Sequence, residues 1–294
     1  FDDDDRAIVA AFASFSAVAL DNARRLALQH ALVEELQEVV DRRRDLIGIV
    51  DWRVAEAKHH GVDMRFGAWA EVADVLALEP DVVVVATGGM PNRSFLATGQ
   101  DLVLDTWDVL GDGGVAAEGH TVLVYDDHGG EPALDAAEHL ARSRARVELV
   151  TPERTVGVGI GSMNSPAYLA AFADFDVQLT LARRLVGVRR AEGGAAHPLV
   201  ATLASDYADT VLERAVDHVV VEHGTLPNDD LYHALVPDST NLGEVDHTAL
   251  LAGQPQAVAT NPAGRFQLFR IGDAVTSRNI HAAVYDALRL CHTL

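Results

Sequence analysis

The sequence predicts an α/β fold in which parallel strands are followed by helices. Residues 81–86 are Asp, four valines and Ala, and they run into Thr87–Gly89, as expected for a strand buried on both faces that ends in a tight turn. Residues 266–271 predict a second buried strand, with a turn at Gly272–Asp273 and an amphipathic helix from Asn279. In such folds the carboxyl ends of the strands form the edge at which ligands bind.

A carboxylate and a helix N-terminus are expected to meet at this edge. The free N–H groups of a helix N-terminus can donate to a flavin carbonyl or a pyrophosphate, and the Asp273 carboxylate can accept hydrogen bonds from ribityl or ribose hydroxyls. A Gly-Asp turn before a helix is also a common capping device. His281 also has two interpretations: it could lie beside a flavin ring, or it could be an ordinary residue in the first turn of the helix.

The combination of motifs resembles known flavoproteins. The sequence ATGG-x-P at residues 86–91, with the sequence IGDA and a helix much later, resembles the flavoprotein reductases with two dinucleotide-binding domains, of glutathione-reductase-like fold. The wider sequence resembles the C-terminal half of the old-yellow-enzyme-like dehydrogenases, in the branch of trimethylamine dehydrogenase, proline-betaine demethylase and 2,4-dienoyl-CoA reductase. This resemblance runs from about residue 45 to the end and is carried by residues 46–53, 61–63, 218–227, 241–246 and 270–290.

The resemblance implies a flavin-dependent oxidoreductase module that acts on C–N or C=C bonds. It implies FAD or ADP at a site made of Thr87, Gly88, Gly89, Gly272, Asp273, Asn279, Ile280 and His281. In the relatives, a barrel with FMN and an iron–sulfur cluster and a first G-x-G-x-x-G unit precede this half, and this sequence contains neither. The first domain is therefore expected to be incomplete, the catalytic residues stay unknown, and a catalytic barrel or an electron-transfer protein is the expected partner.

The same resemblance divides the chain into domains. Residues 45–118 and 215–294 are expected to form a partial FAD-type domain, and residues 119–214 a Rossmann-like NAD(P)-type domain. The latter should contain a strand at 121–125, a helix at 132–141 and a strand at 146–150.

NAD(P) binding by the second domain is not expected. Its first turn reads Asp126-Asp127-His128-Gly129-Gly130-Glu131 instead of G-x-G-x-x-G, and its acidic side chains would repel a pyrophosphate. Thr151 stands where an acid would bind the ribose. A weak NADH site that uses Gly129, Gly130 and Arg154 is the alternative.

The remaining elements follow from local patterns. Helices are expected at 47–59, 70–78, 167–175 and 229–235, and strands at 61–66, 177–181, 185–190, 199–203, 206–212 and 215–222.

Residues 6–44 are expected to form one long helix, because residues spaced alternately by four and three from Ile8 to Val40 are apolar except for Asn22 and Gln29. This seam predicts either a coiled-coil homodimer or a helix folded back on its own domain. Residues 12–26 also resemble the last helix of GAF sensory domains. The competing function is therefore a regulatory or scaffolding protein with a GAF-derived dimerisation helix and a relic nucleotide-binding domain.

Composition excludes several function classes. A net charge of −21 disfavours nucleic acid and anionic membranes as partners, and no apolar run approaches the ~20 residues of a membrane span. One cysteine, Cys291, excludes an internal disulfide, and the absence of His-Glu-x-x-His and Gly-x-Ser-x-Gly gives hydrolase and metal-site readings no support. The expected location is the cytoplasm.

Overall fold

The computed structural model describes residues 48–111, 114–292 and 294. The chain divides into two compact units at the Trp69–Ala70 boundary. The predicted long helix and its seam, and the GAF resemblance, lie outside the described residues.

In the first unit, residues 48–59 are helical, in agreement with the predicted helix. Gly61, with a φ of 73°, ends the helix, and the N–H of Val62 donates to the carbonyl of Ala57 at 3.0 Å. The predicted strand at 61–66 is wrong: these residues are irregular, and none of the described strands pairs with them. Asp63 and Arg65 instead form a local ion pair at 2.9 Å.

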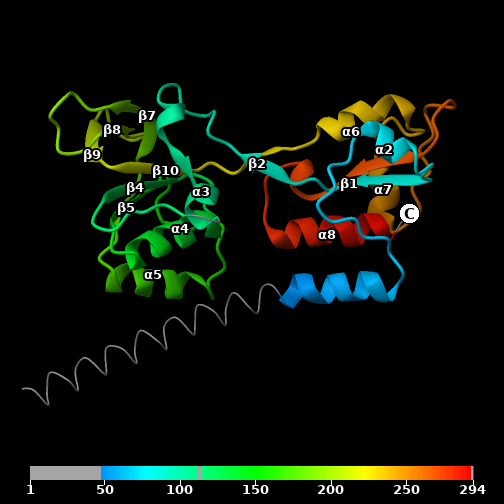
Figure 1. The fold of residues 1–294 in the computed structure, drawn as a ribbon, viewed down its shortest axis with the longest axis horizontal. Coiled ribbons are helices and arrows are strands. Elements are labelled where there is room, and N and C mark those ends of the chain that lie inside the picture. Colours follow the sequence, from blue (N-terminus) through cyan, green and yellow to red (C-terminus); the bar gives the residue numbers. More distant parts are fainter. Residues whose placement is uncertain (1–47, 112–113, 293) are drawn as a thin grey trace, which may run out of the picture. The chain divides into compact units, whose positions relative to one another are not determined.

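The second unit contains a parallel sheet of five strands in the order β3-β10-β4-β5-β6 (Figure 1). The strands are β3 (Leu104–Asp105), β10 (His218–Glu222), β4 (Thr121–Asp126), β5 (Arg146–Val150) and β6 (Gln178–Thr180). The predicted strand–helix–strand unit at 121–150 is confirmed. The sheet reaches beyond the range 119–214 on both sides, because β3 and β10 belong to it; the domain boundaries themselves remain a prediction.

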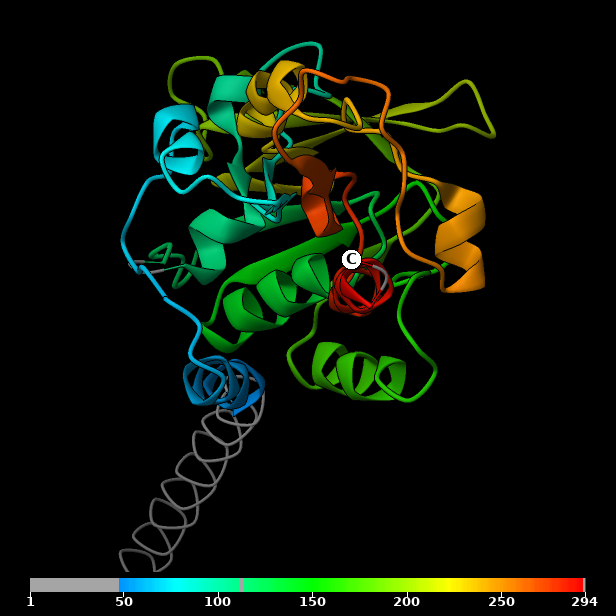
Figure 2. The same cartoon turned by 90° about the vertical axis from the view of Figure 1, so that its right-hand side faces the viewer.

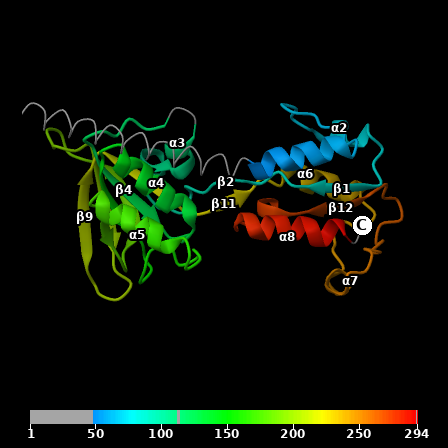
Figure 3. The same cartoon turned by 90° about the horizontal axis from the view of Figure 1, so that it is seen from below.

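Each face of this sheet is covered by a different kind of layer. Helices α3 (Thr106–Leu110), α4 (Glu131–Arg142) and α5 (Ser165–Asp174) belong to the layer on one face. On the other face lies an antiparallel sheet of β7 (Arg184–Arg190), β8 (Leu199–Ala204) and β9 (Val211–Val216). Figure 1 shows β9 above β4 and α5 below it, and Figure 3 shows the same layers from the side of α5.

The sequence of strand β4 is apolar without alternation because both faces of the strand are covered. Val122 and Val124 pack in the core with α4, whereas Leu123 and Tyr125 pack in the core with the antiparallel sheet, and all four are completely buried. A strand covered on both faces needs apolar side chains on both.

The predicted strand at 206–212 is misplaced. The strand is β9, and the residues before it form a turn in which the N–H of Tyr207 donates to Ser205 Oγ at 3.1 Å. The charged residues Glu213 and Arg214 made β9 hard to recognise in the sequence. In the structure Glu213 forms an ion pair with Arg189 at 3.0 Å, and Arg214 forms one with Glu148 at 2.8 Å.

A smaller parallel pair, β1 (Val82–Val85) with β12 (Gln267–Arg270), forms the second centre of the unit. Helices α2 (Val72–Leu76) and α6 (Asp230–Leu235) pack with it in one apolar core around Phe266 and Leu268. Figure 2 shows helix α8 (Ile280–Cys291), in red, end on. The connection between α6 and β12 contains the 3-10 turn η2 (Val236–Asp238) and helix α7 (His247–Ala252).

The chain passes twice between the two parallel sheets. It leaves β1 through β2 (Gly89–Pro91) and returns from β10 through β11 (Thr225–Pro227), and these two short strands pair antiparallel. The similarity of Gly88–Asn92 to Gly224–Asn228 is therefore a similarity between two partner strands.

Candidate functional site

The turn after β12 is built as the sequence predicted, from a strand, a Gly-Asp turn and a capped helix. Gly272 has a φ of 62°, which favours glycine, and Gly272–Ala274 forms one 3-10 turn. Asn279 caps helix α8 (Ile280–Cys291), because its Oδ1 accepts from the N–H of Ala282 at 2.9 Å. The first-turn N–H groups of Ile280 and His281 have no acceptor in the described part of the chain, as is usual at a helix start. These two groups point to a place where an anion or a carbonyl could bind.

Asp273 stands at the centre of this turn. Its Oδ2 accepts from the hydroxyl of Thr225 and its Oδ1 from the N–H of Arg278, both at 3.2 Å. The Thr225 N–H donates to Ser277 Oγ at 2.9 Å. Each carboxylate oxygen keeps a second lone pair, so Asp273, which is half-buried, can still accept from a ligand hydroxyl.

The Thr87–Gly89 turn lies at the same edge. Val85 is opposite Arg270 in the β1–β12 register, so the two strands end together. The Thr87 hydroxyl donates to the carbonyl of Asn228, and the N–H of Asn228 donates to the carbonyl of Gly88 at 3.0 Å.

Gly88 has a φ of 72°, whereas Gly89 is required by space. A Cβ on Gly89 would lie 2.5 Å from Thr225 Oγ1. The glycines of this motif are therefore explained by the β2–β11 crossing.

Thr225 brings the two predicted motifs together and was missed in the sequence analysis. It touches Gly89 on one side and Asp273 on the other. The signal that could have found it is the repeat of Gly-x-x-Pro-Asn at Gly88–Asn92 and Gly224–Asn228. Ile280 and His281 are exposed at the start of α8, with no side-chain hydrogen bond from either in the described residues.

The turn after β4 has a different arrangement. Asp126 is 1% exposed, and its Oδ1 accepts from the N–H groups of Gly129 at 2.8 Å and His128 at 3.2 Å. Its Oδ2 is buried and has no hydrogen-bond partner among the residues described by the structure. Burial raises the pKa of Asp126 to about 6, and the nearby Glu222 carboxylate adds to the rise.

The residues of the alternative NADH site do not form an open phosphate-binding turn. Gly129 has a φ of 78°, but a Cβ there would lie 2.5 Å from Val158 Cγ2, so Val158 covers it. Arg154 is exposed, and a hydrogen bond with Tyr207 raises its pKa. Thr151 is buried, with its hydroxyl accepting from the N–H of Glu153 at 3.2 Å.

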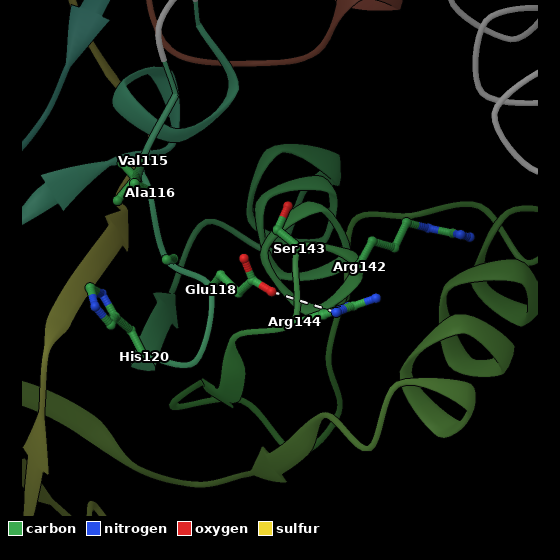
Figure 4. Close-up of a pocket in the computed structure, with 8 residues that line it drawn as sticks. Val115, Ala116, Glu118, His120, Arg142, Ser143 and Arg144 are labelled. Atoms are coloured by element: carbon green, nitrogen blue, oxygen red, sulfur yellow. Dashed lines mark ion pairs between the residues drawn. The ribbon is translucent and has the colours of Figure 1, made fainter. Parts of the chain in front are cut away.

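A hollow of 680 Å³ lies elsewhere, beside the segment that leads into β4 and the end of α4 (Figure 4). Its lining includes His120 and the ion pair of Glu118 with Arg144 at 3.5 Å. Because it lies at the start of β4, it is at the opposite end of this sheet from the turn at Asp126.

The described residues contain neither a metal-binding cluster nor a membrane-spanning helix. No group of three or more His, Cys, Asp or Glu side chains there is arranged to hold a metal ion. Among the helices in the described ranges, none has the length and apolar character to cross a membrane.

Comparison with known proteins gives relatives with oxidoreductase names, although no family model matches the chain. The chain is 46% identical over 249 residues to a probable N-methylproline demethylase of Rhizobium meliloti (strain 1021), which covers 85% of this chain and 36% of the relative. It is 41% identical over 261 residues to the N,N-dimethylglycine/sarcosine dehydrogenase of Chromohalobacter salexigens, with coverages of 85% and 37%. A multifunctional alkene reductase/demethylase of Caballeronia cordobensis is 37% identical over 257 residues, with coverages of 86% and 37%.

Solved structures agree on the fold. The amine oxidase for 6-hydroxypseudooxynicotine from Pseudomonas geniculata N1 matches with a TM-score of 0.64 and 23% identity, covering 83% of this chain and 34% of that one. Histamine dehydrogenase from Rhizobium sp. 4-9 matches with a TM-score of 0.61 and 20% identity, with coverages of 81% and 35%.

This chain thus spans just over a third of the curated relatives it matches. Their names favour the predicted oxidoreductase module over the regulatory or scaffolding alternative.

Proposed function

We propose that this chain is the nucleotide-binding and electron-transfer half of a flavin-dependent oxidoreductase, of the type that demethylates amines or reduces enoates. The observation that supports this most directly is the meeting of the Thr87–Gly89 turn, Thr225 and the Asp273 turn at one sheet edge. The curated relatives carry names of both reaction types, and their full lengths are almost three times what the chain covers.

The residues present fit one half of a dinucleotide. Asp273 would accept from ribityl or ribose hydroxyls, and the N–H groups of Ile280 and His281 would donate to a flavin carbonyl or a phosphate. A bound flavin would supply hydride or single-electron transfer. The second half of an FAD needs a G-x-G-x-x-G cradle, which this sequence does not contain.

In this proposal the domains are those predicted from the sequence, a partial FAD-type domain at 45–118 and 215–294 and a Rossmann-like domain at 119–214. The ligand at the Asp273 edge is FAD or ADP, while FMN and an iron–sulfur cluster would belong to a barrel outside this sequence. Substrate selection would also belong to that barrel. Partners would be the barrel or an electron-transfer protein, with a second copy of this chain joined through residues 6–44.

Titration of the purified protein with FAD, FMN and ADP tests the proposal. Calorimetry should show saturable binding of FAD or ADP, and bound FAD should give the protein the absorbance bands of a flavin. A colourless protein that binds none of the three would contradict the proposal and would support the scaffolding alternative.

A further inference from the structure

The turn between β4 and α4 occupies the position at which a strand–helix unit normally binds the phosphates of a dinucleotide. Free N–H groups of such a turn and the positive end of the helix dipole attract an anion there. In this protein the N–H groups of His128 and Gly129 already have an anionic acceptor, the carboxylate of Asp126. The acceptor comes from the last residue of β4 itself.

A second carboxylate is placed in the same way on the neighbouring strand. Glu222 is opposite Asp126 in the β10–β4 register, and it too is buried. Its Oε1 accepts from the N–H of Gly224 at 2.9 Å and its Oε2 from the Thr106 hydroxyl at 2.6 Å. The carboxyl edge of this sheet therefore presents two buried carboxylates where a pyrophosphate would need bare N–H groups.

The hydrogen bonds of Asp126 do not explain its charge. Asparagine would offer the same acceptor to the N–H groups of His128 and Gly129 without placing an ionised group in the interior. Oδ2 has no partner in the described ranges, so one of the two oxygens of the ionised carboxylate lacks the hydrogen bonds that buried carboxylates usually have. The negative charge costs stability, and repulsion of an approaching anion is a role that needs it.

The loop after β5 adds a cover to the turn. The N–H of Gly159 donates to the carbonyl of Gly129 at 2.9 Å, and Val158 occupies the space beside Gly129. The loop and the Asp126 carboxylate both obstruct the approach of an anion to the turn. Because the loop contains Gly157, Gly159 and Gly161, it is the less rigid of the two.

We propose that Asp126 is the residue that determines nucleotide specificity in this sheet, because its carboxylate occupies the phosphate position of the β4–α4 turn and excludes dinucleotides. The N–H groups of the turn are arranged as in an anion-binding site, and the Asp126 carboxylate is the anion that they bind. Reducing equivalents would therefore not reach this protein from NAD(P)H at this sheet.

Two substitutions separate the carboxylate from the rest of the turn. Asp126→Ala removes the internal acceptor and leaves the N–H groups of His128 and Gly129 free. Asp126→Asn keeps an acceptor in place and removes only the charge, and Asp101→Ala removes an exposed carboxylate outside the turn. Far-ultraviolet circular dichroism and thermal unfolding establish that each variant is folded.

Binding of NADH and of inorganic phosphate is then measured by NADH fluorescence and by calorimetry. The wild type and Asp101→Ala should bind NADH no more tightly than the millimolar range, and Asp126→Ala should bind both anions at least about tenfold more tightly than the wild type. Asp126→Asn should lie between them, because it loses the charge that repels an anion and keeps an acceptor in the turn.

Micromolar NADH binding by the wild type would overturn the proposal, as would equal phosphate and NADH affinities in the wild type and a folded Asp126→Ala. If Asp126→Ala does not fold, Asp126→Ser replaces it, since its shorter side chain leaves the same space for an anion. Amide exchange of His128 and Gly129 gives a second readout, because their protection should fall in the empty variant and return when phosphate is added.

Discussion

The hydroxyl of Thr225 donates to Oδ2 of Asp273 at 3.2 Å, and the same hydroxyl oxygen would lie 2.5 Å from a Cβ at position 89. One side chain thus contacts two motifs that lie far apart in the sequence. The pairing of β1 with β12 already brings the two motifs to the same sheet edge, and Thr225 lies between them there.

The first prediction concerns Asp273. Asp273→Ala should weaken FAD or ADP binding by roughly 10–100-fold, because a charged hydrogen-bond acceptor is worth about 1.5–3 kcal/mol. Calorimetric titration measures this, with Asp101→Ala as a matched exposed control. Thermal unfolding accompanies it, since Asp273 also accepts from Thr225 and from the N–H of Arg278. Equal affinities in a folded variant would remove Asp273 from the site.

The second prediction separates two reasons for glycine in the Thr87–Gly89 turn. Gly89→Ala should lower the free energy of unfolding by about 1–3 kcal/mol, because the added methyl group overlaps Thr225. Combining Gly89→Ala with Thr225→Ala should recover part of the loss, because Oγ1 of Thr225 is the atom nearest to the added Cβ. Gly161 has open space around it, so Gly161→Ala serves as the control. Chemical denaturation measures all four proteins, and no loss in Gly89→Ala would mean that β2 and β11 separate easily.

The third prediction concerns oligomeric state. The apolar seam at Ile8–Val40 predicts a dimer, and replacing Leu26 and Leu36 by Asp would place like charges in it and give monomers. Light scattering decides this. A wild-type chain that is monomeric at tens of micromolar concentration would favour a seam that packs within its own chain.

Local patterns predicted the elements that carry the fold. Apolar runs identified β1, β4 and β12, and the Gly272–Asp273 turn followed from strand and cap signals. Strand β4 is covered on both faces and needs no alternation. Strand β1 was predicted to be buried on both faces, but of its four residues only Val85 is buried and the others are half-buried. Strand β9 was misplaced because the side chains that neutralise Glu213 and Arg214 come from distant strands.

The site was predicted less completely for a similar reason. Thr225 acts through the pairing of β2 with β11, which single-strand patterns do not contain. The role of Asp126 was easier to predict from the sequence than that of Thr225. An Asp followed by Gly three residues later is a local signal for a hydrogen bond from the turn to the Asp side chain. From the sequence, Asp126 was predicted only as a charge that repels phosphate; in the structure its Oδ1 also accepts from the N–H groups of His128 and Gly129.

The last prediction uses the raised pKa of Asp126. In the folded protein this pKa is about 6, against an ordinary value of 3.8, because the ionised carboxylate is buried. Between these values the folded state binds more protons than the unfolded state, so this group's contribution to the free energy of unfolding falls as pH rises. Below about pH 4 the carboxyl group becomes protonated in both states, so the cost of burying its charge is absent.

Asp126→Asn removes this pH dependence. The variant should therefore be more stable than the wild type by about 1–3 kcal/mol at pH 8, and the difference should shrink steadily as the pH falls from 6 to 4. Urea unfolding at a series of pH values measures the difference. Titrating groups that do not interact with Asp126 cancel in the comparison, whereas Glu222 and His128 interact with its charge. Asp101→Asn, which removes one exposed charge from the same acidic protein, corrects for the change in net charge. A difference that stays constant from pH 4 to pH 8 would mean that the Asp126 carboxylate has a partner in solution and carries its charge without cost.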